Sequence, residues 1–212
     1  MSWPWTCAGT EGATSRTNRT RCRSLPTILR GCASWLRLEK PAVVGHSMGG
    51  IVAFDLAAGY PNLTSAVVML DAAVVLPSGV RAAIPSFLEE LRSPGYRDLL
   101  CGYVANFLFI PTDARQRKER ILQSMSAAPQ HVMGLAFEGL RDYDPTEAAG
   151  GLAVPGLYVA AGELQPRSDM ARFHEMFPQT LFGKTVGSGH LCQLQMPEQV
   201  NAMIECFLAI TL

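Results

Sequence analysis

Four short apolar runs recur along the chain, each bounded by turn-forming residues. Continuous apolar runs of this length are typical of strands buried on both faces of a parallel sheet. Apolar side chains spaced by three or four residues, which predict amphipathic helices, fill the segments around them. The runs cover residues 41–44, 65–70, 155–160 and 180–186, and the helical spacings cover 25–38, 48–59, 168–177 and 197–209. Their order predicts an α/β fold, with a mostly parallel sheet flanked by helices.

The pattern changes between residues 78 and 145, where helical spacing replaces the strand-like runs. Segments that end at proline-containing breaks predict a group of helices. These segments cover residues 81–92, 96–108, 114–127 and 130–140. We therefore expect a helical cap insert over 78–145, within a core made of residues 31–77 and 146–212.

The first 30 residues have neither a strand-like nor a helical period over most of their length. They are rich in Thr, Arg, Ser, Gly and Cys, a composition that favours loop or poorly ordered structure. We expect an atypical segment over residues 1–30, and a truncated or frame-shifted reading of a longer gene would explain its composition.

Composition places the chain among globular proteins of one domain. It has 212 residues, 48% of them hydrophobic and 17% charged, which is enough to bury a sizeable core. The formal net charge is zero, so nothing indicates nucleic acid as a partner. Apolar runs stay below the ~18–20 residues needed to cross a bilayer, and the first residues lack the apolar stretch of a signal peptide. The cytoplasm is the expected location.

The cysteines do not have the spacing of a metal or redox site. None of them forms a CxxC pair, which argues against a zinc ribbon or a thioredoxin-like centre, and we expect mostly free thiols in a reducing compartment. The sequence also lacks a phosphate-binding glycine loop, so we expect neither a metal nor a cofactor. The six cysteines are Cys7, Cys22, Cys32, Cys101, Cys192 and Cys206.

The junction between the first predicted strand and the helix after it has a recognisable motif. The residues Gly45-His46-Ser47-Met48-Gly49 match the pattern G-x-S-x-G. On a tight strand-to-helix turn, small residues two positions before and after the serine avoid clashes and leave its hydroxyl exposed to substrate. The backbone N–H of Met48, at the helix start, can then stabilise an oxyanion. The motif predicts Ser47 as a nucleophile.

A serine nucleophile needs a base, and four histidines are available. His46 lies inside the motif, while His131 and His174 lie on predicted helices and are better explained as solvated residues. His190 follows the last predicted strand, after the flexible residues Gly187-Ser188-Gly189. Because chemistry collects at the carboxyl ends of parallel strands, we expect His190 to be the base.

From about Glu39 to Leu208 the chain resembles the α/β-hydrolase superfamily, in particular its esterase- and lipase-like serine hydrolases. The resemblance rests on the segment 43–50, the strand that ends at Asp71, the helical insert and the loop 187–190. It implies a catalytic triad of serine, histidine and an acid. It also implies that the insert is the cap domain, and a serine nucleophile argues against the branches that use an aspartate.

The acid of the triad is left open by the sequence. Family members commonly have an aspartate where this chain has Gln165, and an amide cannot stabilise an imidazolium as a carboxylate does. Asp71 ends the strand that follows the nucleophile helix, where some branches place their acid. We favour Asp71, with Glu163 as the alternative acid and Asp169 as a third candidate.

These residues predict a serine hydrolase that cleaves a carboxylic ester or lactone. Apolar side chains in the insert suggest a hydrophobic acyl or aromatic substrate, although most of them are better explained by packing. Two alternatives stay open: cofactor-free perhydrolase or haloperoxidase activity on the same triad, and a degenerate hydrolase-like protein that binds a ligand without catalysis.

The resemblance also implies something missing before the nucleophile strand. Family members usually have three or four earlier strands there, one of which leads to a loop with the second oxyanion donor. Only about 40 residues precede Pro41 here. An unpaired sheet edge would result, so we expect weak activity and a homodimer, or aggregation, through that edge. A well-behaved monomer in size-exclusion chromatography would argue against this expectation.

Overall fold

The computed structural model describes residues 31, 35–148 and 152–212. Within them, four strands form one sheet in the order β1-β2-β3-β4, and every neighbouring pair is parallel. The predicted α/β class, with a parallel sheet flanked by helices, is confirmed. The strands are β1 (Ala42–His46), β2 (Ala66–Leu70), β3 (Gly156–Ala160) and β4 (Leu181–Lys184).

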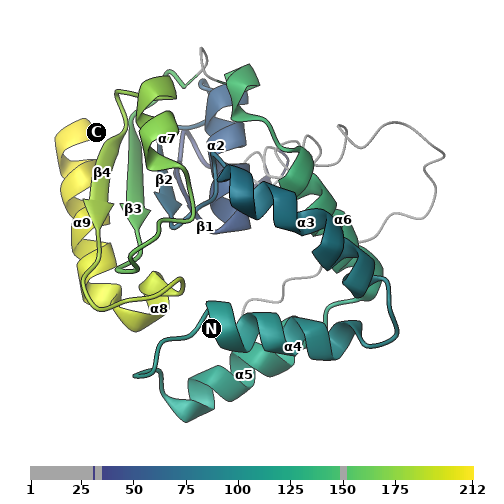
Figure 1. Cartoon of the computed structure of the whole chain (residues 1–212). Helices are drawn as coiled ribbons and strands as arrows, with labels where there is room; N and C mark the ends of the chain where they lie inside the picture. The colour runs from purple at the N-terminus through teal and green to yellow at the C-terminus, as the bar shows by residue number, and fades with distance from the viewer. Residues whose placement is uncertain (1–30, 32–34, 149–151) are drawn as a thin grey trace.

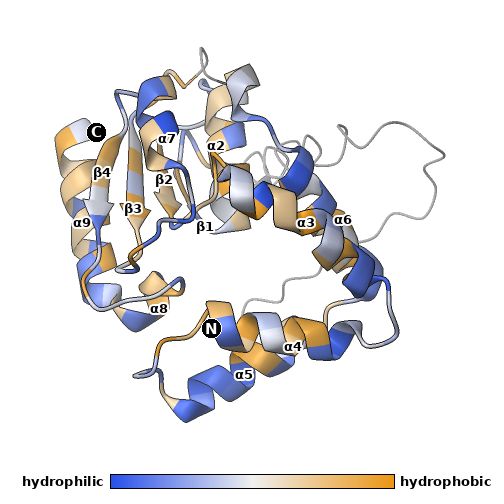
Figure 2. Cartoon of the chain, viewed as in Figure 1, coloured by the Kyte–Doolittle hydropathy of each residue, from blue (hydrophilic) through white to orange (hydrophobic). Residues whose placement is uncertain are grey.

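Helices cover the two faces of the sheet, as Figure 1 shows. On one face, α2 (Met48–Gly59) and α7 (Met170–Met176) pack against alternate residues of β2 and β3, with Phe54 and Phe173 fully buried. On the other face, α9 (Pro197–Thr211) packs against the remaining residues of these strands through Val200 and Phe207. Figure 2 shows apolar colouring on the central strands and on parts of the helices around them. Burial on both faces explains why β2 and β3 are continuously apolar.

Residues 78–148 form helices that extend away from the sheet (Figure 1). Helix α3 packs against α6, and α4 packs against α5. Two apolar clusters hold these pairs, one centred on Leu88 and Leu100 and the other on Val104 and Leu108. The helices are α3 (Ser78–Leu91), α4 (Tyr96–Phe107), α5 (Arg115–Ser126) and α6 (Gln130–Asp142), followed by the 3-10 turn η2 (Pro145–Ala148). Their role as a cap domain stays a prediction.

Some expectations cannot be compared with the structure, and two short elements, η2 and α8 (Cys192–Gln195), were not predicted. The expected atypical segment 1–30 and most of the expected helix 25–38 lie outside the described residues. Helix α8 follows His190. Four residues complete only one helical turn, so no period could have indicated it.

Strand β1 lies at the edge of the sheet formed by the described residues. Its Val44 is 48% exposed, whereas Val67 and Val68 of β2 are fully buried. The N–H of Ser47 bonds to the carbonyl of Leu70, so the alternation along a parallel strand turns the backbone groups of the even-numbered β1 residues away from β2. The open edge of the whole chain and the homodimer stay predictions, because residues 1–30 lie outside the described residues.

Candidate active site

Ser47 occupies a sharp turn between β1 and α2. Its backbone has φ 55° and ψ −123°. L residues rarely adopt this conformation, and the residues that do are often found at functional sites. The carbonyl of Ser47 already accepts the N–H groups of Gly50 and Ile51, at 2.9 and 3.3 Å. Strand and helix therefore meet at this one residue, and its side chain stands at the carboxyl end of the sheet.

The glycines around Ser47 have different roles. A Cβ on Gly45 would overlap the carbonyl of Gly49 and lie 2.7 Å from the Cα of Gly50, and one on Gly50 would lie 2.5 Å from the Cβ of Ala72. A Cβ on Gly49 would meet nothing within 4 Å among the described residues. The prediction that position 49 needs a small side chain is therefore wrong for the described part of the chain. What packs tightly there is the backbone of Gly49, whose carbonyl lies against Gly45.

The first turn of α2 leaves backbone donors available beside Ser47. Since Gly50 and Ile51 donate to the Ser47 carbonyl, Met48 and Gly49 carry the first N–H groups of the helix, which have no intrahelical acceptor. Ser47 makes no side-chain cap to them. The partial positive charge of a helix N-terminus favours an anion at this point.

His190 lies against Ser47, although 143 residues separate them. Its Nε2 is 3.0 Å from the Oγ of Ser47, and only 6% of the residue is exposed. Gly187, with φ 78°, turns the chain after β4 back over the sheet, a backbone conformation that glycine adopts without a steric cost. The flexible loop expected from the sequence thus brings this histidine to the serine.

Asp71 completes a hydrogen-bonded chain with these two residues. Its Oδ2 is 2.7 Å from the Nδ1 of His190, and its Oδ1 accepts the N–H of Ala161 at 3.1 Å. Because a carboxylate can only accept, His190 carries its proton on Nδ1 and leaves Nε2 free to accept from Ser47. Asp71 is 1% exposed, so water does not compete for its oxygens.

The alternative acids lie elsewhere. Glu163 accepts the backbone N–H of His190 at 3.1 Å and pairs with Arg167 at 3.2 Å, so it contacts the loop and not the imidazole nitrogen. Asp169 caps the start of α7 by accepting the N–H of Arg172, and Gln165 is exposed.

Arg167 was not among the predicted site residues. Its Nε is 3.6 Å from the Oδ2 of Asp71, and its Nη2 donates to the carbonyl of Phe107 at 2.6 Å. Arg167 therefore joins the end of α4 to the carboxylate beside His190. Its spacing of four residues from Glu163 is the one signal that the sequence offers, and such pairs are common on solvated surfaces.

His46 supports the same loop from the core side. Its Nε2 donates to the carbonyl of His190 at 2.7 Å, and the two rings lie 4.6 Å apart. Burial, and after it the charge of a protonated His190, lower the pKa of His46 to about 4. His46 is consequently neutral near pH 7 and adds no charge next to Ser47.

The depressed pKa of His46 predicts a pH-dependent stability. Between about pH 4 and pH 6.5 the unfolded chain binds a proton on His46 that the folded chain does not, so the free energy of unfolding falls as the pH falls. We expect the stability difference between wild type and His46→Gln to decrease by about 2 kcal/mol from pH 7 to pH 5. Urea unfolding of both proteins at the two pH values measures it, and an unchanged difference would contradict the assignment.

The other two histidines lie away from the site. His131 and His174 are exposed, and the Nδ1 of His174 donates to the carbonyl of Met170. No cluster of three or more possible metal ligands occurs among residues 31, 35–148 and 152–212. In the same part of the chain, no helix is both long and apolar enough to span a bilayer, and Cys101, Cys192 and Cys206 are free thiols.

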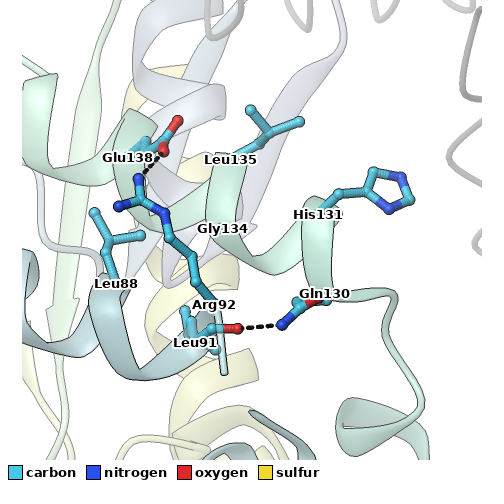
Figure 3. Close-up of a pocket in the computed structure, with 8 residues that line it drawn as sticks. All are labelled: Leu88, Leu91, Arg92, Gln130, His131, Gly134, Leu135 and Glu138. Carbon is cyan, nitrogen blue, oxygen red and sulfur yellow. Dashed lines mark hydrogen bonds and ion pairs between the residues drawn. The ribbon is translucent and has the colours of Figure 1, made fainter. Parts of the chain in front are cut away.

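A hollow of about 450 Å³ lies on the insert, between α3 and α6 (Figure 3). Three of its polar side chains bond to one another or to the backbone: Arg92 pairs with Glu138 at 3.3 Å, and the amide of Gln130 donates to the carbonyl of Leu91. The remaining lining is mostly Leu88, Leu91 and Leu135. Nothing in it matches the chemistry gathered around Ser47.

A serine on a strand-to-helix turn, at the carboxyl end of a parallel sheet, defines the class of α/β hydrolases. The sequence model described as "Alpha/beta hydrolase family" matches residues 3–203. The chain belongs to the α/β hydrolase family.

Individual relatives agree with this family. The chain is 25% identical over 182 residues to a putative carbamate hydrolase, RutD, of Cronobacter turicensis, a match that covers 81% of this chain and 67% of the relative. A 57-residue match to the lipase LipV of Mycobacterium tuberculosis is 49% identical and covers 26% of this chain and 21% of the lipase. A solved structure of a thermophilic esterase from Thermogutta terrifontis is 23% identical, with a TM-score of 0.75 over 90% of this chain and 72% of that one. The chain thus spans about two thirds of the length of the RutD relative.

Proposed function

We propose that the protein is a serine hydrolase that cleaves a carboxylic ester or lactone through an acyl-enzyme on Ser47. The observation that carries the proposal is the continuous chain from Ser47 Oγ to His190 Nε2, at 3.0 Å, and from His190 Nδ1 to Asp71, at 2.7 Å. Both distances lie within the reach required for proton transfer before any substrate binds.

The three residues and the start of α2 have different roles in the reaction. Ser47 attacks the acyl carbon while His190 Nε2 takes its proton, and the negative charge of Asp71 stabilises the imidazolium that forms. The N–H of Met48, at the start of α2, donates to the carbonyl oxygen as it becomes an oxyanion. His190 then returns the proton to the leaving alkoxide, and water repeats the sequence to release the acid and regenerate Ser47.

The insert supports a substrate with a hydrophobic acyl or aromatic group. Tyr103 packs against Phe87, Phe107 and Phe137, with ring centroids 5.4 to 5.8 Å apart. The carbonyl of Phe107 is bonded to Arg167, which lies beside Asp71. This aromatic cluster is therefore linked to a residue beside the triad, at the carboxyl end of the sheet. Apolar walls next to reactive groups commonly bind acyl chains.

A carbamate is the second candidate substrate, because the RutD relative is a putative carbamate hydrolase. A carbamate has a carbonyl carbon between an oxygen and a nitrogen, and attack on it gives the same kind of oxyanion as attack on an ester. The proposed residues would act on them unchanged, with an amine leaving in place of an alkoxide.

A fluorophosphonate probe tests the proposal without knowledge of the substrate. The probe forms a covalent bond with a serine only where a base activates it, so we expect a single adduct whose peptide contains Ser47. The adduct should be absent from Ser47→Ala and strongly slowed in His190→Ala. Absence of labelling in the folded wild-type protein would favour the non-catalytic binding protein instead.

A further inference from the structure

The loop that carries His190 is bonded to the insert as well as to the core. The N–H of Gly189 donates to the Oε1 of Gln195 at 2.7 Å, and the Nε2 of Gln195 donates to the Oδ2 of Asp113 at 2.7 Å. Gln195 ends α8, whereas Asp113 lies in the connection between α4 and α5. One side chain thus spans from the residue before His190 to the insert.

Asp113, which accepts the hydrogen bond from Gln195, is itself held in place by several contacts. Its side chain is 1% exposed, its Oδ2 also accepts the N–H of Ile110 at 2.9 Å, and its Oδ1 lies 3.5 Å from the guanidinium of Arg117. A buried carboxylate held by a backbone donor and a nearby cation has little freedom to move. The position of Gln195 is therefore set by the connection between α4 and α5.

Apolar contacts also attach the residues on either side of His190 to the insert. Leu191 is 6% exposed and packs with Val104 and Leu108 of the α4 region. On the other side, a Cβ added to Gly189 would lie 2.6 Å from a methyl group of Ile110, so the backbone there touches the insert directly. Both chain neighbours of His190 are consequently fixed to the α4–α5 segment, residues 96–126.

We propose that the α4–α5 segment positions the His190 imidazole through Gln195 and Asp113. The core holds the same residue from the other side, where Glu163 accepts its N–H and His46 donates to its carbonyl. Displacement of a catalytic group by about 1 Å can cost about 100-fold in rate. The inference rests on the proposed function for the role of His190 as the base, and it makes Gln195 and Asp113 positioning residues.

Gln195→Met tests the inference, because methionine has a similar length and makes neither hydrogen bond. We expect kcat for a p-nitrophenyl ester to fall about 10- to 100-fold, with KM changed less than about threefold. Gln199→Met is the matched control. Gln199 likewise makes two hydrogen bonds through its side-chain amide, both to the backbone of Val186 before the loop, and its replacement should change kcat less than about threefold.

A second measurement, which needs no substrate turnover, reports the position of the His190 imidazole by ¹H NMR. The proton shared between His190 Nδ1 and Asp71 should give a far-downfield ¹H resonance in the wild type, which Gln195→Met and Asp113→Ala should weaken through exchange with water. A folded Gln195→Met protein that keeps this resonance and wild-type kcat would overturn the proposal, as would equal losses in Gln199→Met. If wild type neither labels nor turns over, the proposed function fails, and the resonance alone decides the positioning.

Discussion

Replacing Ser47 by alanine is expected to lower kcat for p-nitrophenyl ester hydrolysis by at least about 10⁴-fold. Alanine keeps the turn but removes the oxygen that lies 3.0 Å from His190, so no acyl-enzyme can form. What remains is catalysis by binding and by the helix N-terminus at Met48, which in serine hydrolases exceeds water by only about 10³–10⁴-fold. Initial rates across a series of acyl lengths measure the loss.

Wild-type activity itself sets the range of this experiment. An assay with long incubation extends the range over which a loss of rate can be measured. Ser93→Ala, at an exposed serine between α3 and α4, is the control and should keep the wild-type rate. Equal rates in wild type and Ser47→Ala would remove the enzymatic function.

The strands and the nucleophile turn could be predicted because their signals are local. Strands β2 and β3 are buried on both faces and so are apolar at every position. The turn at Ser47 requires glycine at position 45 for a reason that its immediate neighbours supply, since Gly49 and Gly50 lie against it. The local sequence was thus enough to predict a tight strand-to-helix turn at Ser47.

The partner of His190 could not be decided from the sequence, because the decision depends on which strands are neighbours. Strand β2 lies between β1 and β3, so Asp71 ends up between Ser47 and the N–H of Ala161. Nothing within the segment around Glu163 indicates that its carboxylate points to a backbone N–H instead of to the imidazole. Gln195 could not be predicted for a related reason, because its two hydrogen-bond partners are 6 and 82 residues away along the chain.

Asp71→Asn is expected to lower kcat by about 10⁴-fold, the second largest effect among these variants. The amide oxygen would keep the hydrogen bond from Ala161, which turns the NH₂ group toward His190 Nδ1, 2.7 Å away. Since an NH₂ group donates, Nδ1 must then accept, and the imidazole proton moves to Nε2. His190 would face Ser47 with a proton already in place and could not act as its base.

Glu163→Gln separates the two carboxylates with the same chemical change. The amide oxygen of glutamine can still accept the N–H of His190, and the lost charge faces Arg167 and not the imidazole, so we expect less than about a tenfold loss of kcat. Both variants should unfold cooperatively, which denaturant titration checks before kinetics. If Glu163→Gln loses more activity than Asp71→Asn, the acid is Glu163, and substrate binding must rearrange the loop 187–190. A loss confined to Asp71→Asn would place the acid at the end of β2, one strand earlier than the position occupied by Gln165.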